Sequence, residues 1–310
     1  MNNKIIDNFT KEILYYEYQY YITNDKKYYY KSQALKKGLL IIKKFTTKII
    51  NSTQLNNIIG IGNGIKTRID NILQGKSPAY KFPEYDIINK LLSIIGIGYK
   101  TVFKLIKDNN IKSMDDFIDK VNNGEIHLND KIKLGIKYYN KYEINIPRKE
   151  IDDIRGYIIS ILPKKYTIEI CGSYRRMKQS SNDIDVLITS DNYNDNELRN
   201  IINIMKDNNF IIDDLTNKNY ITKYMGFCKY KNNPIRRIDI RYINKESFYY
   251  SLLYFTGSDK FNRFLRKLAK SNGYKLNEYG LYKGGKFIHV KSEEDIFKLL
   301  KLPYTDPKHI

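Results

Sequence analysis

The sequence is poor in residues that bind soft metals or form disulfides. Its 310 residues include no tryptophan, three histidines and two cysteines, Cys171 and Cys228. No group of cysteines and histidines has the spacing of a zinc site, which argues against a zinc-binding module. We expect both thiols to stay reduced in an intracellular protein, and they could be neighbours on adjacent strands.

Long apolar runs are also missing. None reaches the length of a membrane-spanning helix, and residues 1–7 lack the apolar core of a signal peptide. The sequence therefore predicts an intracellular protein without a membrane partner. Its lysine runs suit nuclear import, and a cytoplasmic viral factory fits the sequence equally well.

Acidic residues are scarce compared with basic ones. There are 34 Asp and Glu against 54 Lys and Arg, a net charge of +20, and this excess indicates a polyanionic partner. Lys, Asn, Ile and Tyr are abundant, as in a protein encoded by an A+T-rich genome such as that of a small virus. Part of the charge and many of the 29 tyrosines therefore reflect base composition, so we assign no base-stacking role to Tyr28–Tyr30.

Two aspartates, Asp183 and Asp185, stand two residues apart in an apolar run that follows a Gly-Ser turn and an arginine pair at 171–176. In a strand such residues share one face, where their carboxylates repel unless a hard divalent cation such as Mg²⁺ lies between them. A lone Asp-x-Asp is more typical of a solvated strand edge. A second strand-like run, 236–241, adds Asp239, and this combination favours a two-metal site for phosphoryl chemistry.

Two glycine hairpins, 59–65 and 95–100, each place an apolar residue between glycines ahead of a helical pattern. Such a turn brings backbone N–H groups at a helix N-terminus close to a phosphate. One hairpin alone is as typical of a tight helix–helix turn. The pair predicts helix-hairpin-helix motifs that bind DNA backbones without reading sequence, through Gly60, Gly62, Gly64, Gly96 and Gly98.

These motifs, in this order, resemble those of family X DNA polymerases. The matching segments are 172–176 with Asp183 and Asp185, 236–241, 253–262, 277–282, 294–297 and both hairpins. The resemblance is closest to the DNA polymerase beta type, because no BRCT domain precedes the first small domain. It implies a multidomain protein with all-α helix-hairpin-helix domains at 1–80 and 81–146, an α+β nucleotidyltransferase palm at 147–245 and a small α+β nucleotide-selecting subdomain at 246–310.

The residue patterns predict several short helices in 8–76, a linker at Ser77-Pro78 and Pro83, and a helical unit at 84–142. Further helices are expected at 148–162, 194–208 and 258–271. The expected strands are 166–170, 184–188, 224–230 and 235–243.

The resemblance also implies roles for individual residues. Asp183, Asp185 and Asp239 would hold two Mg²⁺ ions, which Mn²⁺ could replace, and Asp239 could accept the proton of the attacking hydroxyl. The nucleotide would be bound by Arg148, Ser173, Arg176, Asn182, Tyr254, Phe255, Gly257, Asp259 and Asn262. Besides the hairpin glycines, DNA would be bound by Lys31, Lys66, Arg68, Lys223, Arg237, Arg263 and Arg266. Backbone carbonyls of Ile59, Ile61, Gly96 and Gly98 would hold Na⁺ or K⁺.

The expected function is template-directed filling of short gaps in DNA from dNTPs, as in base excision repair, by a monomer that binds gapped or nicked duplexes. A 5'-deoxyribose phosphate lyase would need a lysine where this chain has Arg68, and arginine cannot form a Schiff base. Lys66 or Lys31 could replace it only with suitable geometry and pKa. The alternatives are a nucleotidyltransferase with weak template dependence and a non-catalytic DNA clamp at gaps.

Overall fold

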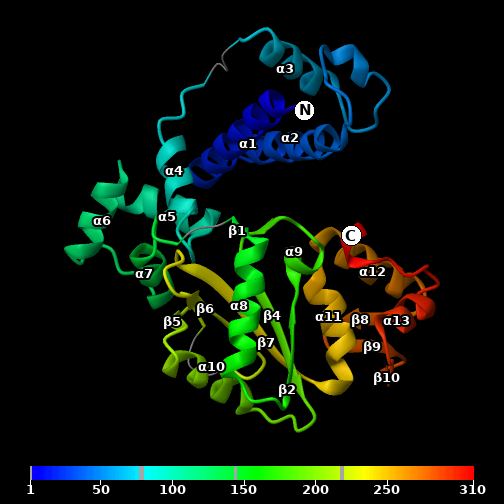
Figure 1. Cartoon of the computed structure of the whole chain (residues 1–310). Coiled ribbons are helices and arrows are strands. Elements are labelled where there is room, and N and C mark those ends of the chain that lie inside the picture. Colours follow the sequence, from blue (N-terminus) through cyan, green and yellow to red (C-terminus); the bar gives the residue numbers. More distant parts are fainter. Residues whose placement is uncertain (1, 77–79, 143–144, 217–219) are drawn as a thin grey trace. The chain divides into compact units, whose positions relative to one another are not determined.

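The computed structural model describes residues 2–76, 80–142, 145–216 and 220–310, so the predicted linker at Ser77-Pro78 lies outside the described residues. The described chain divides into two compact units, 1–136 and 137–310. Figure 1 shows helices alone in the first unit and a sheet with helices in the second. No helix among the described residues is long and apolar enough to cross a membrane.

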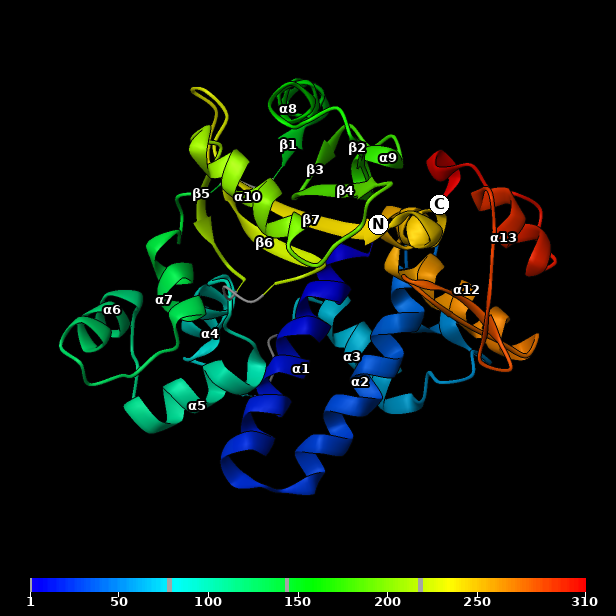
Figure 2. The same cartoon turned by 90° about the horizontal axis from the view of Figure 1, so that it is seen from below.

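The first unit begins with two long helices, α1 (Asn3–Thr23) and α2 (Lys26–Lys44). The prediction of several short helices was wrong here, because the only break before residue 44 is a tight turn. Asn24 adopts a left-handed φ of 56° and ends α1, and the Asp25 carboxylate accepts from the Lys27 N–H at 2.9 Å to begin α2. Figures 1 and 2 both show the two helices side by side.

The remaining helices of this unit carry the two glycine hairpins. A short 3₁₀ helix, η1 (Ser52–Leu55), precedes α3 (Asn63–Leu73), and the helices that follow are α4 (Tyr85–Leu92), α5 (Tyr99–Asn109), α6 (Met114–Asn122) and α7 (Asp130–Lys137). Ile5 and Phe9 of α1, Leu35 and Leu39 of α2 and Ile69 of α3 pack into one buried core.

The two hairpins have the same backbone conformation. Gly60 and Gly96 have φ of 98° and 95°, a region that favours glycine, and Gly62 and Gly98 are the N-cap residues of α3 and α5. Helix α7 packs closely on the second hairpin, since a Cβ on Gly135 would lie 2.2 Å from the Ile95 carbonyl oxygen.

The second unit is built on a five-stranded sheet of order β2-β4-β7-β6-β5. Its strands are β2 (Tyr166–Ile170), β4 (Ile184–Ser190), β5 (Ile211–Asp214), β6 (Lys223–Cys228) and β7 (Arg236–Asn244). Strands β4 and β7 pair in parallel and the other pairs are antiparallel. A two-stranded ribbon joins β1 (Ile146–Pro147) to β3 (Ser180–Ser181).

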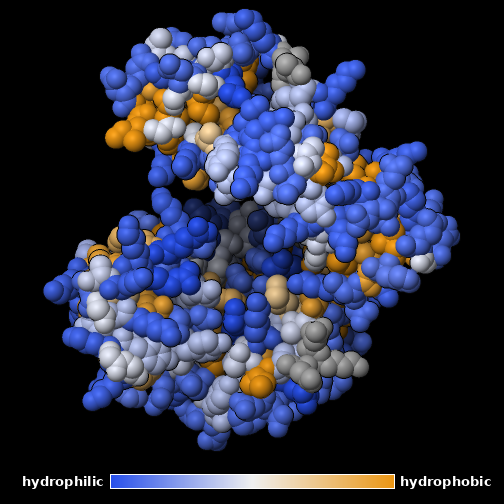
Figure 3. All heavy atoms as spheres, turned by 180° about the vertical axis from the view of Figure 1, so that it is seen from behind, coloured by the Kyte–Doolittle hydropathy of each residue, from blue (hydrophilic) through white to orange (hydrophobic). Residues whose placement is uncertain are grey.

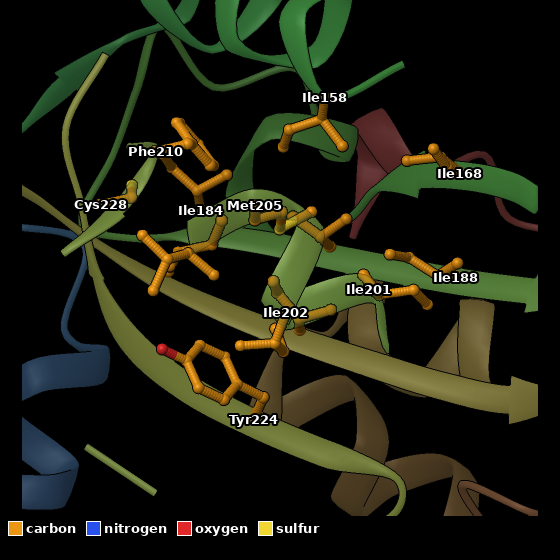
Figure 4. Close-up of a cluster of buried hydrophobic side chains, with 14 of the residues drawn as sticks. Ile158, Ile168, Ile184, Ile188, Ile201, Ile202, Met205, Phe210, Tyr224 and Cys228 are labelled. Atoms are coloured by element: carbon orange, nitrogen blue, oxygen red, sulfur yellow. The ribbon is translucent and has the colours of Figure 1, made fainter. Parts of the chain in front are cut away.

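Helices cover both faces of this sheet. Ile158 of α8 (Arg148–Ile161) and Ile201 of α10 (Glu197–Asp207) pack with Ile184 and Ile188 of β4 in one buried cluster (Figure 4). Leu187 points to the opposite face and packs with Leu252 of α11 (Phe248–Thr256). The continuous apolar run of β4 is therefore that of a strand buried on both sides.

A smaller α+β part completes the chain. It contains α12 (Asp259–Ser271), a three-stranded sheet of β8 (Tyr274–Asn277), β9 (Gly280–Lys283) and β10 (Lys286–Ile288), and α13 (Glu293–Leu299). Tyr250 of α11, Leu265 of α12, Leu281 of β9 and Phe297 of α13 pack into its buried core.

The two cysteines are not neighbours, contrary to our expectation. Cys171 follows β2 and Cys228 ends β6, and strands β4 and β7 lie between them in the sheet. The reason is that β2 is an edge strand whose neighbour is β4, so it does not pair with β6. Both thiols are free and buried, and burial raises the pKa of each.

Candidate active site

Three carboxylates converge where β4 and β7 begin. Asp185 and Asp239 are direct partners in the parallel register of these strands, and Asp183 stands just before β4. One oxygen from each carboxylate can be chosen so that all three lie within 4.8 Å of one another. The structure thus brings together the three aspartates that the sequence singled out.

This cluster is electrostatically unfavourable without a cation. Burial raises the pKa of Asp185 to about 8, and the carboxylates of Asp183 and Asp239 add to that rise. Burial also raises the pKa of Asp239, although the Arg237 charge opposes the shift. Asp239 Oδ1 is a buried atom without a hydrogen-bond partner among the described residues. Three oxygen donors with an unused acceptor suit a hard divalent cation.

Arg237 lies directly on the carboxylates. Its Nη2 donates to Asp183 Oδ2 at 2.8 Å and to Asp239 Oδ2 at 3.2 Å. The family resemblance made Arg237 a DNA-binding residue, and the sequence carried no signal that it would bridge two of the aspartates. One positive charge partly neutralises the cluster in the absence of metal.

Gly172 is the first residue of the short helix α9 (Gly172–Arg175) and lies against the Asp185 side chain. Its φ is 56°, and an added Cβ would lie 2.0 Å from Asp185 Oδ2. The Cys171 N–H donates to the Asp185 carbonyl at 2.8 Å and holds the turn on the strand. Only glycine permits both this φ and this approach.

The predicted phosphate-binding side chains lie in and around α9. Ser173 Oγ donates to Ser181 Oγ at 2.8 Å, and Arg176 Nη1 donates to the Thr256 carbonyl oxygen. Arg148 Nη1 donates to the Tyr174 carbonyl at 2.6 Å, and its guanidinium lies 4.0 Å from the Tyr174 ring centroid. Asn182 is exposed beside Asp183.

The predicted nucleotide pocket lies at the junction of α11 and α12. Asn262 Nδ2 donates to the Tyr254 carbonyl at 2.7 Å, and the Arg266 guanidinium lies 5.7 Å from the Tyr254 ring centroid. Phe255 lies 5.4 Å from the guanidinium of Arg241. These contacts tie the end of α11 to α12 and leave Gly257 at the turn between them.

The other residues predicted here are on the surface. Asp259 and Arg263 are both exposed and form an ion pair along α12. Lys223 is exposed at the start of β6, opposite Arg241 of β7.

In the first unit, a cavity of about 620 Å³ lies between α1, α2 and α3, and Lys31 and Arg68 line it. Arg68 Nε donates to Glu12 Oε1 at 2.9 Å, and Arg68 Nη1 donates to the Gly64 carbonyl at 2.9 Å. The sequence missed Glu12, which lies 56 residues from Arg68 and stands in no motif.

Lys66, our other candidate for the missing amine, is not among the described residues that line this cavity. Its Nζ donates to Asn56 Oδ1 at 2.8 Å. The idea that Lys66 replaces the missing lysine therefore has no geometric support.

The hairpin residues differ in exposure. Ile59 is 96% exposed at the tip of the first hairpin, whereas Ile61 is buried in the core. The carbonyls of Gly62 and Gly98 accept the first helical hydrogen bonds of α3 and α5.

A mixed sheet with an aspartate triad beside a Gly-Ser helix, followed by a small α+β part, has the layout of a palm and thumb. Residues 145–245 match the family model of the DNA polymerase beta palm, and residues 251–309 match that of the DNA polymerase beta thumb. The chain belongs to the family X DNA polymerases.

Relatives come from plants and animals. DNA polymerase lambda of Arabidopsis thaliana is 27% identical over 303 residues, covering 87% of this chain and 56% of the relative. DNA polymerase lambda of Rattus norvegicus is 26% identical, covering 93% and 53%. DNA nucleotidylexotransferase of Xenopus laevis is also 26% identical, covering 86% and 61%. The chain thus spans little more than half the length of these relatives.

Proposed function

We propose that this protein is a DNA-directed DNA polymerase that extends a primer 3'-hydroxyl with dNTPs. The observation that carries this proposal is the convergence of Asp183, Asp185 and Asp239 beside the Gly172 turn, within a palm of the matching family. The reaction is in-line attack of the hydroxyl on the α-phosphorus, with pyrophosphate as leaving group.

The three aspartates would hold two divalent cations, Mg²⁺ with Mn²⁺ as a substitute, which would activate the hydroxyl and neutralise the phosphates. Asp239, on the strand beside Asp185, would serve the metal at the hydroxyl and could take its proton. Arg237 would then turn from the carboxylates to the primer end.

Around this centre, Ser173 and Arg176 would bind the outgoing phosphates, with help from Arg148 and the backbone N–H of Asn182. The backbone at Tyr254 and Phe255 would lie against the sugar and exclude a 2'-hydroxyl, with Gly257 completing the turn. Asn262 and Asp259 would contact the incoming base and its surroundings. Arg263 and Arg266 would face the template, and Lys223 the DNA backbone.

The first unit would bind DNA through the two hairpins as helix-hairpin-helix motifs. Their shared backbone conformation and the lysine-rich α2 support this role. Hydrophilic residues also dominate the face drawn in Figure 3. The carbonyls of Ile59, Ile61, Gly96 and Gly98 would hold Na⁺ or K⁺. The protein would comprise four domains, with boundaries after residues 80, 146 and 245.

Gapped or nicked duplexes are the proposed substrates, and the protein would act as a monomer of the beta type in base excision repair, in the nucleus or a viral factory. Lys31 and Arg68 would contact a 5'-phosphate, and Lys66 would contact the adjoining backbone. Arg68 is paired with Glu12 and cannot form the imine that a lyase needs, so lyase activity would have to come from Lys31, the lysine that lines the same cavity.

A second candidate is nucleotide addition with weak template dependence. The similarity to DNA nucleotidylexotransferase favours it, although the polymerase lambda relatives match as closely.

A one-nucleotide gapped duplex with Mg²⁺ and single dNTPs tests these alternatives, with Asp239→Asn as the inactive variant. Asp191→Asn is the matched control, because Asp191 is an exposed aspartate that follows the other end of β4. We expect the wild type and Asp191→Asn to insert only the complementary nucleotide and Asp239→Asn to insert none. Addition of all four nucleotides to a single-stranded primer would favour weak template dependence. Binding of the gap without insertion would leave only a DNA clamp.

A further inference from the structure

Arg175 connects the helix of the phosphate-binding motif to the thumb. It is the residue between Tyr174 and Arg176 at the end of α9, and its guanidinium contacts both α11 and α13. We propose that Arg175 and Glu293 form a positioning pair that sets the nucleotide pocket at the end of α11 relative to the aspartate triad. The expected effect on dNTP kinetics rests on the proposed polymerase function. The expected effect on the order of α11 and α13 does not.

The pair has the geometry of a specific contact. Arg175 Nη1 donates to Glu293 Oε1 at 2.9 Å, and Nη2 donates to Oε2 at 2.5 Å, so the two planar groups meet side by side. Nη1 also donates to Thr256 Oγ1 at 2.8 Å. One guanidinium therefore connects α9, the last residue of α11 and the first residue of α13.

This pair is also buried. The side chains of Arg175 and Glu293 are 21% and 9% exposed, whereas those of Arg263 and Asp259 in the surface pair on α12 are 74% and 69% exposed. Exposed pairs are screened by solvent, whereas removing one partner of a buried pair leaves an uncompensated charge. Of these two ion pairs, we therefore expect the loss of Arg175–Glu293 to displace the helices that it joins and the loss of Arg263–Asp259 to have little effect.

Thr256 joins this pair to the proposed phosphate site. Its hydroxyl accepts from Arg175 and donates to the Leu252 carbonyl at 2.6 Å, which fixes it to α11. Its carbonyl oxygen accepts from Arg176, the proposed phosphate ligand. The two neighbouring arginines therefore meet at one threonine, one through its side chain and one through its backbone.

In this arrangement Arg176 would bind the phosphates and Arg175 would position the helices. A triphosphate would compete with the Thr256 carbonyl for Arg176, since both accept from the same guanidinium. Arg175 would keep Thr256 and α13 in place while Arg176 changes partners. Loss of the Arg175–Glu293 contact should therefore weaken nucleotide binding more than the chemical step.

The test compares Glu293→Gln and Arg175→Lys with Glu197→Gln. Glu197 is a buried carboxylate that accepts from Lys165 and Tyr166 beside β2, so it matches Glu293 in substitution and burial but contacts no residue of α9, α11 or α13. Two measurements are made on full-length protein: kcat and KM for the complementary dNTP, and hydrogen exchange of 248–257 and 293–299 without substrate.

We expect Glu293→Gln to raise KM at least about tenfold with a smaller change in kcat, because the contact positions the nucleotide pocket and touches none of the reacting atoms. Exchange in both segments should rise. Arg175→Lys should show a smaller effect of the same kind, because lysine keeps the charge but not the paired geometry. Glu197→Gln should leave KM and exchange in these segments at wild-type values.

Unchanged exchange in Glu293→Gln would overturn the proposal whatever the activity, as would equal changes in Glu293→Gln and Glu197→Gln. A fall in kcat alone would also overturn it. If the wild type inserts no nucleotide, the polymerase proposal fails by itself, and the exchange measurement still decides whether Arg175 and Glu293 position the thumb.

Discussion

Replacing Gly172 with alanine is the most direct test of the active-site geometry. An alanine Cβ would lie 2.0 Å from Asp185 Oδ2 and 3.0 Å from Asp185 Cγ, whereas real Cβ contacts essentially never fall below 3.0 Å. The carboxylate or the α9 turn must therefore move by roughly 1 Å, and a displacement of that size can reduce the rate by about a hundredfold. The left-handed φ of 56° adds roughly 1–2 kcal/mol of destabilisation for a residue with a Cβ.

Gly156→Ala is the matched control. Gly156 is exposed in α8, and an added Cβ would meet nothing within 4 Å. Alanine at an exposed helix interior should stabilise the protein by about 0.5–1 kcal/mol, with no effect on activity.

The assay is single-nucleotide insertion into a gapped duplex, with kcat/KM measured beside chemical denaturation of each variant. We expect Gly172→Ala to lose about two orders of magnitude in kcat/KM while remaining folded, and Gly156→Ala to keep wild-type kcat/KM. Wild-type activity in Gly172→Ala would refute the reasoning, because it would mean that the Asp185 carboxylate need not occupy the position that the structure gives it.

Two further predictions concern the first unit and the acid stability of the palm. A lysine introduced by Arg68→Lys would lie beside Glu12, whose charge would raise the lysine pKa, and each unit lowers the free amine about tenfold at neutral pH. Borohydride trapping on a 5'-deoxyribose phosphate should therefore detect an imine in Arg68→Lys/Glu12→Gln but little in Arg68→Lys alone, and equal trapping would show that Glu12 has no such effect. Hydrogen bonds from Lys165 and Tyr166 lower the pKa of Glu197 to about 2 from 4.5, so this group stabilises the folded state above pH 4.5 and its contribution is lost as the pH falls towards 2. In denaturation experiments, Glu197→Gln should reduce the fall in unfolding free energy between pH 4.5 and about 2. An unchanged fall over this pH range would contradict the lowered pKa of Glu197.

Local spacing determined much of this protein from the sequence alone. Alternation along an apolar strand put Asp183 and Asp185 on one face, and the predicted strand 166–170 and helix 258–271 fall within one residue of β2 and α12. Positive φ at Gly60 and Gly96 likewise follows from the glycine turns. These features depend on neighbours in the chain, so residue order suffices to predict them.

Tertiary structure decided which distant residues meet. Glu12 and Arg68 are 56 residues apart, and Arg175 and Glu293 are 118 apart. No periodicity relates such positions, because each contact depends on the path of the chain between them. The same reason separated Cys171 from Cys228, since β4 and β7 occupy the positions between their strands. The sequence thus determined which aspartates share one face, and packing alone decided which charged residues connect α9 to α11 and α13.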